Sequence, residues 1–258
     1  MPEAEDLALV QAAAQEAGAI ALRYWRRDPK SWDKGGDHGP VSEADLAVNA
    51  ALTERLQAAR PGYGWLSEET PDDAARLGQE AVFILDPIDG TRAFLAGEEG
   101  FAISVAVVRQ GRPVAAVVHL PARQQTYAAH AGGPATCNGA VLACGTRQEL
   151  RGADVLSNRA ALAPEHWPGG VPEVKRSFRT SLAWRMCLVA EGRFDAMLTL
   201  RPAWEWDIAA GALIAERAGC RVSDRRGGPL RFNSAPPQAD GVVLANPALH
   251  AALVAGLR

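Results

Sequence analysis

Residues 82–94 read VFILDPIDGTRAF, and this stretch carries most of what the sequence says about the fold. An apolar run of strand length leads into two acids three residues apart, Asp86 and Asp89. Pro87 lies between them and fixes one backbone angle, so we expect the two carboxylates to turn toward one point at the edge of a sheet.

Carboxylate oxygens in this arrangement favour Mg2+, which takes one or two carboxylates per ion and completes its octahedron with phosphate and water. Gly90 and Thr91 follow at the start of a predicted helix, where backbone N–H groups suit a phosphate. The structural alternative is that Asp86 and Asp89 only cap a turn after a strand, which is a common use of aspartate.

Two further segments place acids next to apolar runs. Glu68 and Glu69 stand in WLSEET, and Asp207 stands in WEWDIAAGA. Taken alone, the glutamate pair would be a solvated helix start, and Asp207 would be the N-cap of the apolar helix that follows it. An N-cap is compatible with metal binding, because a helix start is a rigid place from which to aim a carboxylate.

Lys34 precedes Asp45 by eleven residues, across a glycine-rich polar stretch from Asp33 to Pro40. Residues 42–45, Ser-Glu-Ala-Asp, match a capping box and predict the start of a helix. Asp45 can therefore act simply as the N3 member of that box.

The order DPIDGT resembles the signature of the inositol monophosphatase superfamily. The segments around Glu68, Asp207 and Lys34 to Asp45 are similar to further motifs of that family, and over residues 34–211 they follow the family's order. The C-terminal piece also resembles the family's closing segment, so the likeness covers nearly the whole chain. It implies an α/β fold of the α+β type, a layered α-β-α-β-α sandwich shared with fructose-1,6-bisphosphatase.

The resemblance also implies a Mg2+-dependent phosphoric monoester hydrolase with two or three Mg2+ ions per site, in which water attacks phosphorus directly. The implied metal ligands are Glu68, Asp86, the Ile88 carbonyl, Asp89 and Asp207. The implied catalytic residues are Asp45, Thr91 and Glu68, with Asp45 orienting the Thr91 hydroxyl that positions and deprotonates the water. The implied substrate-binding residues are Gly90, Thr91, Ser181 and Asp207, and further candidates at the site are Lys34, Glu69, Arg201 and Trp204.

The substrate is predicted from residues near the C-terminal candidate aspartate. Inositol monophosphatases have a glutamate seven residues before that aspartate, whereas this chain has Leu200. Residues 181–192 look like the 3'(2'),5'-bisphosphate nucleotidase branch, and Trp204 offers a surface on which adenine can stack. The arginines that can supply charge for a second phosphate are Arg179, Arg185, Arg193 and Arg201. We favour hydrolysis of 3'-phosphoadenosine 5'-phosphate, with inositol-1-monophosphatase or a related sugar-phosphate phosphatase as the alternative.

Two other classes of protein are disfavoured. Phosphatases with an aspartyl nucleophile carry D-x-D-x-T after a strand, whereas this chain has the longer D-x-x-D-G-T. A non-catalytic sensor of metal or phosphate would not need a complete set of metal and water residues. That set is present in this chain as Glu68, Asp86, Asp89, Thr91 and Asp207.

Composition excludes several further functions. The chain has 258 residues, 48% of them hydrophobic, which is typical of a globular protein, and its net charge of -3 argues against a nucleic-acid polymer as partner. No apolar run reaches membrane-spanning length, and the N-terminus does not resemble a signal peptide. The four scattered cysteines indicate reduced thiols, and the histidines lack the paired spacing of a zinc site. We expect a cytoplasmic protein, a monomer or a homodimer, that acts on a small phosphorylated substrate and has no membrane partner.

The predicted elements change their pattern near residue 150. Before it, we expect helices over residues 5–27 and 42–59, and then a largely antiparallel sheet with strands at 63–66, 82–85, 101–108, 113–119 and 126–129. After it, strands at 154–156, 194–198 and 242–245 alternate with helices at 181–191, 208–218 and 247–256. We expect one compact unit of two halves, residues 1–150 with most metal ligands and residues 151–258 with Asp207 and the residues on the substrate side.

Overall fold

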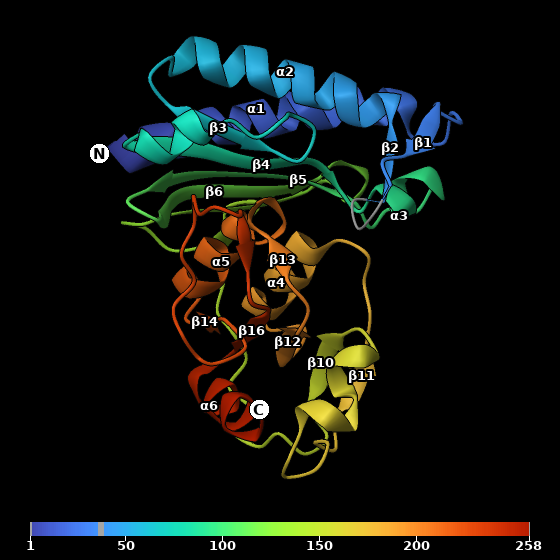
Figure 1. The fold of residues 1–258 in the computed structure, drawn as a ribbon, viewed down its shortest axis with the longest axis vertical. Coiled ribbons are helices and arrows are strands. Elements are labelled where there is room, and N and C mark those ends of the chain that lie inside the picture. Colours follow the sequence, from blue (N-terminus) through green and yellow to red (C-terminus); the bar gives the residue numbers. More distant parts are fainter. Residues whose placement is uncertain (1, 36–38, 258) are drawn as a thin grey trace.

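The computed structural model describes residues 2–35 and 39–257, and it shows alternating layers of helix and sheet (Figure 1). Helices α1 (Pro2–Tyr24) and α2 (Glu43–Ala59) form an outer layer that covers a large sheet. Helices α4 (Leu182–Ala190) and α5 (Glu205–Arg217) form the central layer, and a second sheet and helix α6 (Pro247–Gly256) lie beyond it. The predicted α-β-α-β-α sandwich is confirmed.

In the described part of the chain, the first sheet has seven strands in the order β3-β4-β5-β6-β7-β8-β9. Strands β3 and β4 are parallel and the other neighbours are antiparallel, as predicted. Helices cover both faces, so β4 is buried along its whole length and β5 along nearly all of it. The strands are β3 (Gly64–Ser67), β4 (Ala81–Asp89), β5 (Ala102–Arg109), β6 (Arg112–Leu120), β7 (Gln125–His130), β8 (Thr136–Cys137) and β9 (Ala140–Val141).

The second sheet mixes parallel and antiparallel neighbours, in the order β11-β10-β12-β16-β14 within the described residues. Its strands are β10 (Asp154–Ser157), β11 (Lys175–Ser177), β12 (Ala196–Thr199), β14 (Arg221–Ser223) and β16 (Val242–Ala245). Two short pairs complete the strands: β1 (Ser31–Asp33) with β2 (Pro40–Ser42), and β13 (Ala203–Trp204) with β15 (Gln238–Ala239). The remaining turns of helix are α3 (Thr91–Leu95), η1 (Ala74–Gly78), η2 (Pro121–Arg123), η3 (Ala160–Leu162) and η4 (Pro164–His166).

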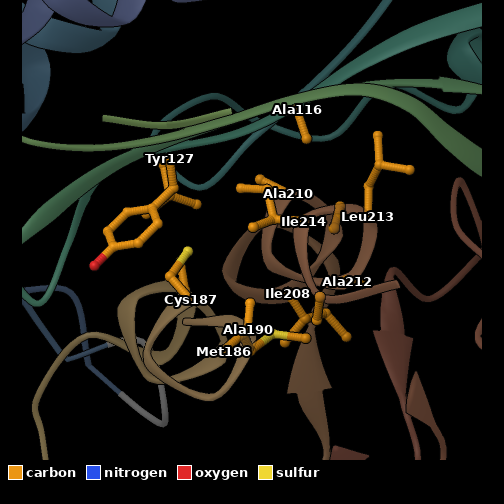
Figure 2. Packing of buried hydrophobic residues seen from close by; sticks show 14 of the residues in the cluster. Ala116, Tyr127, Met186, Cys187, Ala190, Ile208, Ala210, Ala212, Leu213 and Ile214 are labelled. Atoms are coloured by element: carbon orange, nitrogen blue, oxygen red, sulfur yellow. The ribbon is translucent and has the colours of Figure 1, made fainter. Parts of the chain in front are cut away.

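Buried apolar side chains from both sequence halves fill the space between the large sheet and the central helices. Figure 2 shows Tyr127 of β7 beside Cys187 of α4, and Ala116 of β6 facing Ala210 and Ile214 of α5. The small alanines let α5 approach the sheet closely, because close packing leaves little room for larger side chains there. This packing sets the position of α5, and with it that of Asp207.

Several element boundaries differ from the predictions. Helix α1 ends at Tyr24 rather than at residue 27, because Arg26 adopts a left-handed φ of 59° and its Nε donates to the Gly97 carbonyl at 2.9 Å. Helix α5 begins at Glu205 rather than at residue 208. Strand β12 begins at Ala196, two residues later than predicted.

Strand β4 extends beyond its predicted end to include Asp89. Its register with β5 shifts between Asp86 and Asp89, where Pro87 has no N–H to give to the ladder. Gly90 then turns the chain with a φ of 102°, and a Cβ at this position would lie 3.0 Å from the Gly100 carbonyl oxygen. This irregular strand end is what brings the predicted acids to one place.

None of the helices in the described ranges is both long and apolar enough to cross a membrane. The polar stretch predicted from Asp33 to Pro40 includes residues 36–38, which lie outside the described residues. The same holds for His38, one of the histidines considered for a zinc site.

Candidate active site

A cavity of about 630 Å³ opens where the end of β4 meets the first turns of α4 and α5. Most of the predicted site residues line it, although they come from segments far apart in the sequence. Those that line it are Glu68, Asp86, Ile88, Asp89, Gly90, Thr91, Arg201, Trp204 and Asp207. The other four candidates, Lys34, Asp45, Glu69 and Ser181, contact these residues.

Three acids converge on one point of this cavity. Glu68, Asp86 and Asp207 each place one carboxylate oxygen within 4.8 Å of the others. Glu68 follows β3, Asp86 belongs to β4, and Asp207 lies in the first turn of α5. Asp86 is 2% exposed, and one of its oxygens accepts a hydrogen bond from the Ile88 N–H at 2.9 Å.

The charges of these acids are costly to bury. Burial, with the neighbouring carboxylates, raises the pKa of both Asp86 and Asp207 well above the usual range. Burial also raises the pKa of Glu68 to about 7, although the Lys34 ammonium opposes that rise. A divalent cation would remove the repulsion, and a set of closely spaced carboxylate oxygens is the ligand type that hard cations prefer. The donor set therefore fits a metal ion.

Asp89 is held differently from the other acids. Its carboxylate accepts three hydrogen bonds at the start of α4, from the Ser181 hydroxyl at 2.6 Å, the Ala183 N–H at 2.7 Å and the Leu182 N–H at 3.2 Å. These bonds and the charge of Arg185 lower the pKa of Asp89, but burial outweighs them and raises it overall. Asp89 thus ties the end of β4 to α4 as well as facing the cavity.

Thr91 and Asp45 form the predicted pair. The Thr91 hydroxyl lies 3.1 Å from a carboxylate oxygen of Asp45 and 3.1 Å from the Ile88 carbonyl oxygen. The second oxygen of Asp45 accepts from the N–H and the hydroxyl of Ser42, which closes the predicted capping box. Burial raises the pKa of Asp45 to about 6, while the bonds from Ser42 oppose the shift. Asp45 therefore serves both as a helix cap and as the partner of Thr91.

Lys34 pairs with both glutamates that precede β4. Its ammonium lies 2.7 Å from a Glu68 oxygen and 2.8 Å from a Glu69 oxygen. Burial alone would lower the pKa of Lys34, but the charges of Glu68 and Glu69 outweigh it and raise the pKa. The structure therefore places the candidate Lys34 in direct contact with the candidates Glu68 and Glu69.

The interpretation of Asp207 as an N-cap is wrong. Trp204 occupies the N-cap position of α5, so Asp207 lies inside the first turn of the helix. From there, its side chain faces the cavity beside Asp86 and Glu68. The reason is that α5 begins earlier than predicted, where Glu205 anchors the helix start by accepting hydrogen bonds from Asn233 and Ser234.

Three side chains that were considered for the substrate lie away from the cavity. Ser181 is fully buried and donates to Asp89 rather than facing the cavity. Leu200 is 6% exposed and packs in the apolar core around β12 and β16. Arg193 forms an ion pair with Glu191 at 3.7 Å and does not line the cavity. Because Leu200 does not line the cavity, its identity gives no information about whether the cavity binds a polyol.

The arginines that do line the cavity are Arg92, Arg185 and Arg201. Burial lowers the pKa of Arg185 to about 10, the charge of Asp89 opposes that shift, and Arg201 adds to it. Within residues 2–35 and 39–257, neither Arg185 nor Arg201 has a carboxylate oxygen within 4.0 Å. Two neighbouring guanidinium groups without an ion pair make one wall of the cavity attractive to anions.

The cavity wall also includes Arg92, Phe178 and Gln238, which were not among the candidate site residues. Arg92 lies inside the recognised DPIDGTRAF stretch, so its closeness to the acids could have marked it. Phe178 stands in a loop after β11 and Gln238 in the two-residue strand β15, for neither of which a pattern was found in the sequence, and only the fold brings them to the cavity.

The whole chain resembles one protein family. Residues 3–258 match the model of the inositol monophosphatase family. An inositol-1-monophosphatase of Rhizobium meliloti (strain 1021) is 36% identical over 260 residues, which is 95% of this chain and 92% of that relative. A 3'(2'),5'-bisphosphate nucleotidase CysQ of Salmonella typhimurium is 30% identical over 229 residues, which is 86% of this chain and 91% of that relative.

Solved structures give the same result. The extragenic suppressor protein suhB from Bartonella henselae superposes with a TM-score of 0.82 at 25% identity, over 98% of both chains. An IMPase from Thermotoga maritima superposes with a TM-score of 0.82 at 25% identity, over 97% of this chain and 96% of that one. The fold is therefore shared with these proteins.

Proposed function

This chain belongs to the inositol monophosphatase family, and from that membership and the site geometry we propose a Mg2+-dependent phosphomonoesterase that prefers 3'-phosphoadenosine 5'-phosphate. The relatives reported above are phosphatases and a nucleotidase, so the chain is a phosphoric monoester hydrolase. One observation carries the proposed reaction: Glu68, Asp86 and Asp207 converge beside the pair formed by Thr91 and Asp45.

The residues that would hold two or three Mg2+ ions are Glu68, Asp86, Asp89, Asp207 and the Ile88 carbonyl. Bound Mg2+ would offset the charge of the phosphoryl oxygens and lower the pKa of a bound water. The raised pKa values of Glu68, Asp86 and Asp207 support this proposal. They reflect the unfavourable free energy of burying these carboxylates near one another, and a bound cation would offset it.

Thr91 and Asp45 would prepare the attacking water. When Asp45 is ionised, the Thr91 hydroxyl donates a hydrogen bond to the Asp45 carboxylate. The lone pairs of the hydroxyl oxygen then point away from Asp45, toward the cavity. Those lone pairs can accept a hydrogen bond from water and orient its oxygen toward phosphorus. As the new P–O bond forms and the ester P–O bond breaks, the water proton passes by way of Thr91 to Asp45, and the leaving alkoxide takes a proton from solvent.

The preference for a bisphosphate rests on Arg185 and Arg201. Both line the cavity that contains the acids, and neither is neutralised by an ion pair among the described residues. A second phosphate on the substrate would supply that missing charge through charge-assisted hydrogen bonds. An uncharged polyol would leave both guanidinium groups without such a partner.

Measuring kcat/KM with Mg2+ for 3'-phosphoadenosine 5'-phosphate, inositol 1-phosphate and fructose 1,6-bisphosphate tests the proposal. We expect the nucleotide to be the best of the three, and Arg201→Met to lower its kcat/KM more than that of inositol 1-phosphate. If inositol 1-phosphate exceeds the nucleotide by about tenfold, a transition-state preference of about 1.4 kcal/mol, the ranking is reversed.

Inositol-1-phosphatase activity is the second candidate. A specific observation favours it, because the Rhizobium meliloti relative with that name is more similar to this chain than the Salmonella nucleotidase is, at 36% against 30% identity. Moreover, Leu200 no longer argues against inositol, since its side chain is buried outside the cavity.

A further inference from the structure

Phe178 is an exposed aromatic side chain on the wall of the cavity. It follows β11, and 46% of its surface is exposed although the cavity around it is lined mainly by polar and charged groups. The exposed part of this large apolar side chain is not covered by other groups of the fold. Such a residue is typical of a place where a ligand's apolar surface is received.

Arg185 holds the Phe178 ring from one side. The guanidinium carbon lies 4.4 Å from the ring centroid, which is a cation–π contact. The Arg185 Nε donates to the Arg179 carbonyl at 2.5 Å and its Nη2 donates to the Thr180 carbonyl at 3.2 Å. The same guanidinium therefore fixes the backbone next to Phe178 and supports its ring.

A second contact fixes the loop between β11 and α4, which contains Phe178, to the large sheet. The Thr180 hydroxyl donates to the Gly100 carbonyl at 2.7 Å, and Gly100 precedes β5. The ring is consequently pre-positioned, so a ligand that stacks on it would not have to order the loop first.

Trp204, the residue expected to stack on adenine, is committed to another aromatic ring. Its ring stacks on Trp206 with centroids 4.7 Å apart and an interplanar angle of 8°. Both tryptophans line the cavity at the start of α5. Among the described residues, the Phe178 ring contacts the cation of Arg185, and 46% of the Phe178 surface is exposed.

We propose that Phe178 is the platform on which the planar base of a nucleotide substrate stacks, with Arg185 beneath the ring. This proposal rests on the proposed function, since it assumes that a nucleotide enters the cavity. Stacking tolerates any base, because each base offers a π face, and Arg185 beside the ring would at the same time attract the phosphates. The cavity volume of about 630 Å³ lies within the range of sites that enclose drug-sized ligands.

Adenosine 5'-monophosphate carries a base and ribose 5-phosphate does not. The difference between their affinities therefore measures the contribution of the base, which is where stacking on Phe178 would act. Their dissociation constants would be measured by calorimetry on the full chain, with Ca2+ in place of Mg2+ to prevent turnover. We expect the wild type to bind the nucleotide about tenfold more tightly than the sugar phosphate, and Phe178→Leu to remove that difference. Phe178→Tyr should retain it, because it keeps the ring.

Leu77→Ala is a matched control, since Leu77 is 44% exposed and does not line the cavity. It should leave both dissociation constants unchanged. The proposal is overturned if the wild type binds both ligands equally, or if Phe178→Leu weakens both to the same extent. The wild type could also bind the nucleotide more tightly, as expected, and yet hydrolyse inositol 1-phosphate faster than 3'-phosphoadenosine 5'-phosphate. That result would contradict the proposed substrate but would still support Phe178 as the platform.

Discussion

The hydroxyl of Thr91 lies 3.1 Å from a carboxylate oxygen of Asp45, although 46 residues separate the two in the sequence. The contact joins the first residue of α3, just after the end of β4, to the first turn of α2 in the outer helical layer. Because Asp45 also closes the capping box of α2, the start of that helix and the proposed water-activating pair depend on one carboxylate.

Thr91→Ala and Asp45→Asn should have overlapping effects on catalysis. Each change interrupts the same proton path, so we expect kcat to fall by at least about a hundredfold for either variant, with little change in KM. The double variant should be no slower than the slower single variant. Steady-state kinetics of all four proteins give the answer, and additive losses would show that the two residues do not act as a unit.

The pH dependence of kcat/KM should show an acidic limb near pH 6. Asp45 must be ionised to accept the proton, and burial raises its pKa to about 6. Activity is therefore expected to rise as pH increases through 6, and to approach a plateau above about pH 7. The measurement needs saturating Mg2+ at each pH, since protons also compete for Glu68, Asp86 and Asp207. Full activity at pH 5 would contradict the assignment of Asp45 as base.

The metal-free protein should lose stability as pH rises between about 4.5 and 7. The pKa of Glu68 is about 7 in the fold against 4.5 ordinarily, so in this window the folded state binds more protons than the unfolded state. A raised carboxyl pKa therefore lowers the free energy of unfolding as the pH increases through the window. Thermal unfolding with and without Mg2+ checks this, and the Mg2+-induced rise in Tm should be larger at pH 8 than at pH 5.5.

Asp86→Asn should stabilise the metal-free protein while it removes activity. It deletes a buried charge next to Glu68 and Asp207, and the amide oxygen can still accept from the Ile88 N–H. We expect Tm to rise by roughly 2–4 °C, which is what about 1 kcal/mol amounts to in a chain of this size. The rise should be greatest at high pH, and a lower Tm would contradict the electrostatic argument.

Asp89→Asn and Asp207→Asn should both remove most activity, but only the first should also destabilise the fold. The carboxylate of Asp89 accepts three hydrogen bonds from the start of α4, and an amide would present its NH2 group to at least one of those donors. A donor left unpaired costs about 1–3 kcal/mol. Urea unfolding of the metal-free variants separates the two effects, and equal stabilities would argue against the structural role of Asp89.

Leu200→Glu should destabilise the protein rather than create a preference for inositol 1-phosphate. Leu200 is 6% exposed in an apolar core, so a glutamate there would bury an unpaired charge. We expect a loss of about 2 kcal/mol or more, whereas Leu200→Met should cost less than about 1.5 kcal/mol. A stable Leu200→Glu variant with increased inositol 1-phosphatase activity would show that this side chain can reach the cavity.

Through its resemblance to the inositol monophosphatase family, the sequence by itself predicted the layered fold, the reaction class and the candidate acids of the site. The motifs that carry this resemblance are local: Asp86, Asp89 and Thr91 stand within one strand and turn, and Asp45 stands in a capping box that is readable over four residues. Apolar periodicity also located most helices and strands, because the period reports which face of an element is buried.

Only the tertiary structure decided which way the other side chains point. Leu200 and Arg201 are neighbours in the sequence, yet Leu200 packs in the core while Arg201 lines the cavity, where the chain bends after the end of β12. Likewise, Ser181 is turned toward Asp89, and Phe178 reaches the cavity because Arg185 holds its loop in place. These positions depend on contacts between segments that are distant in the chain, and no local pattern in a single sequence records such contacts.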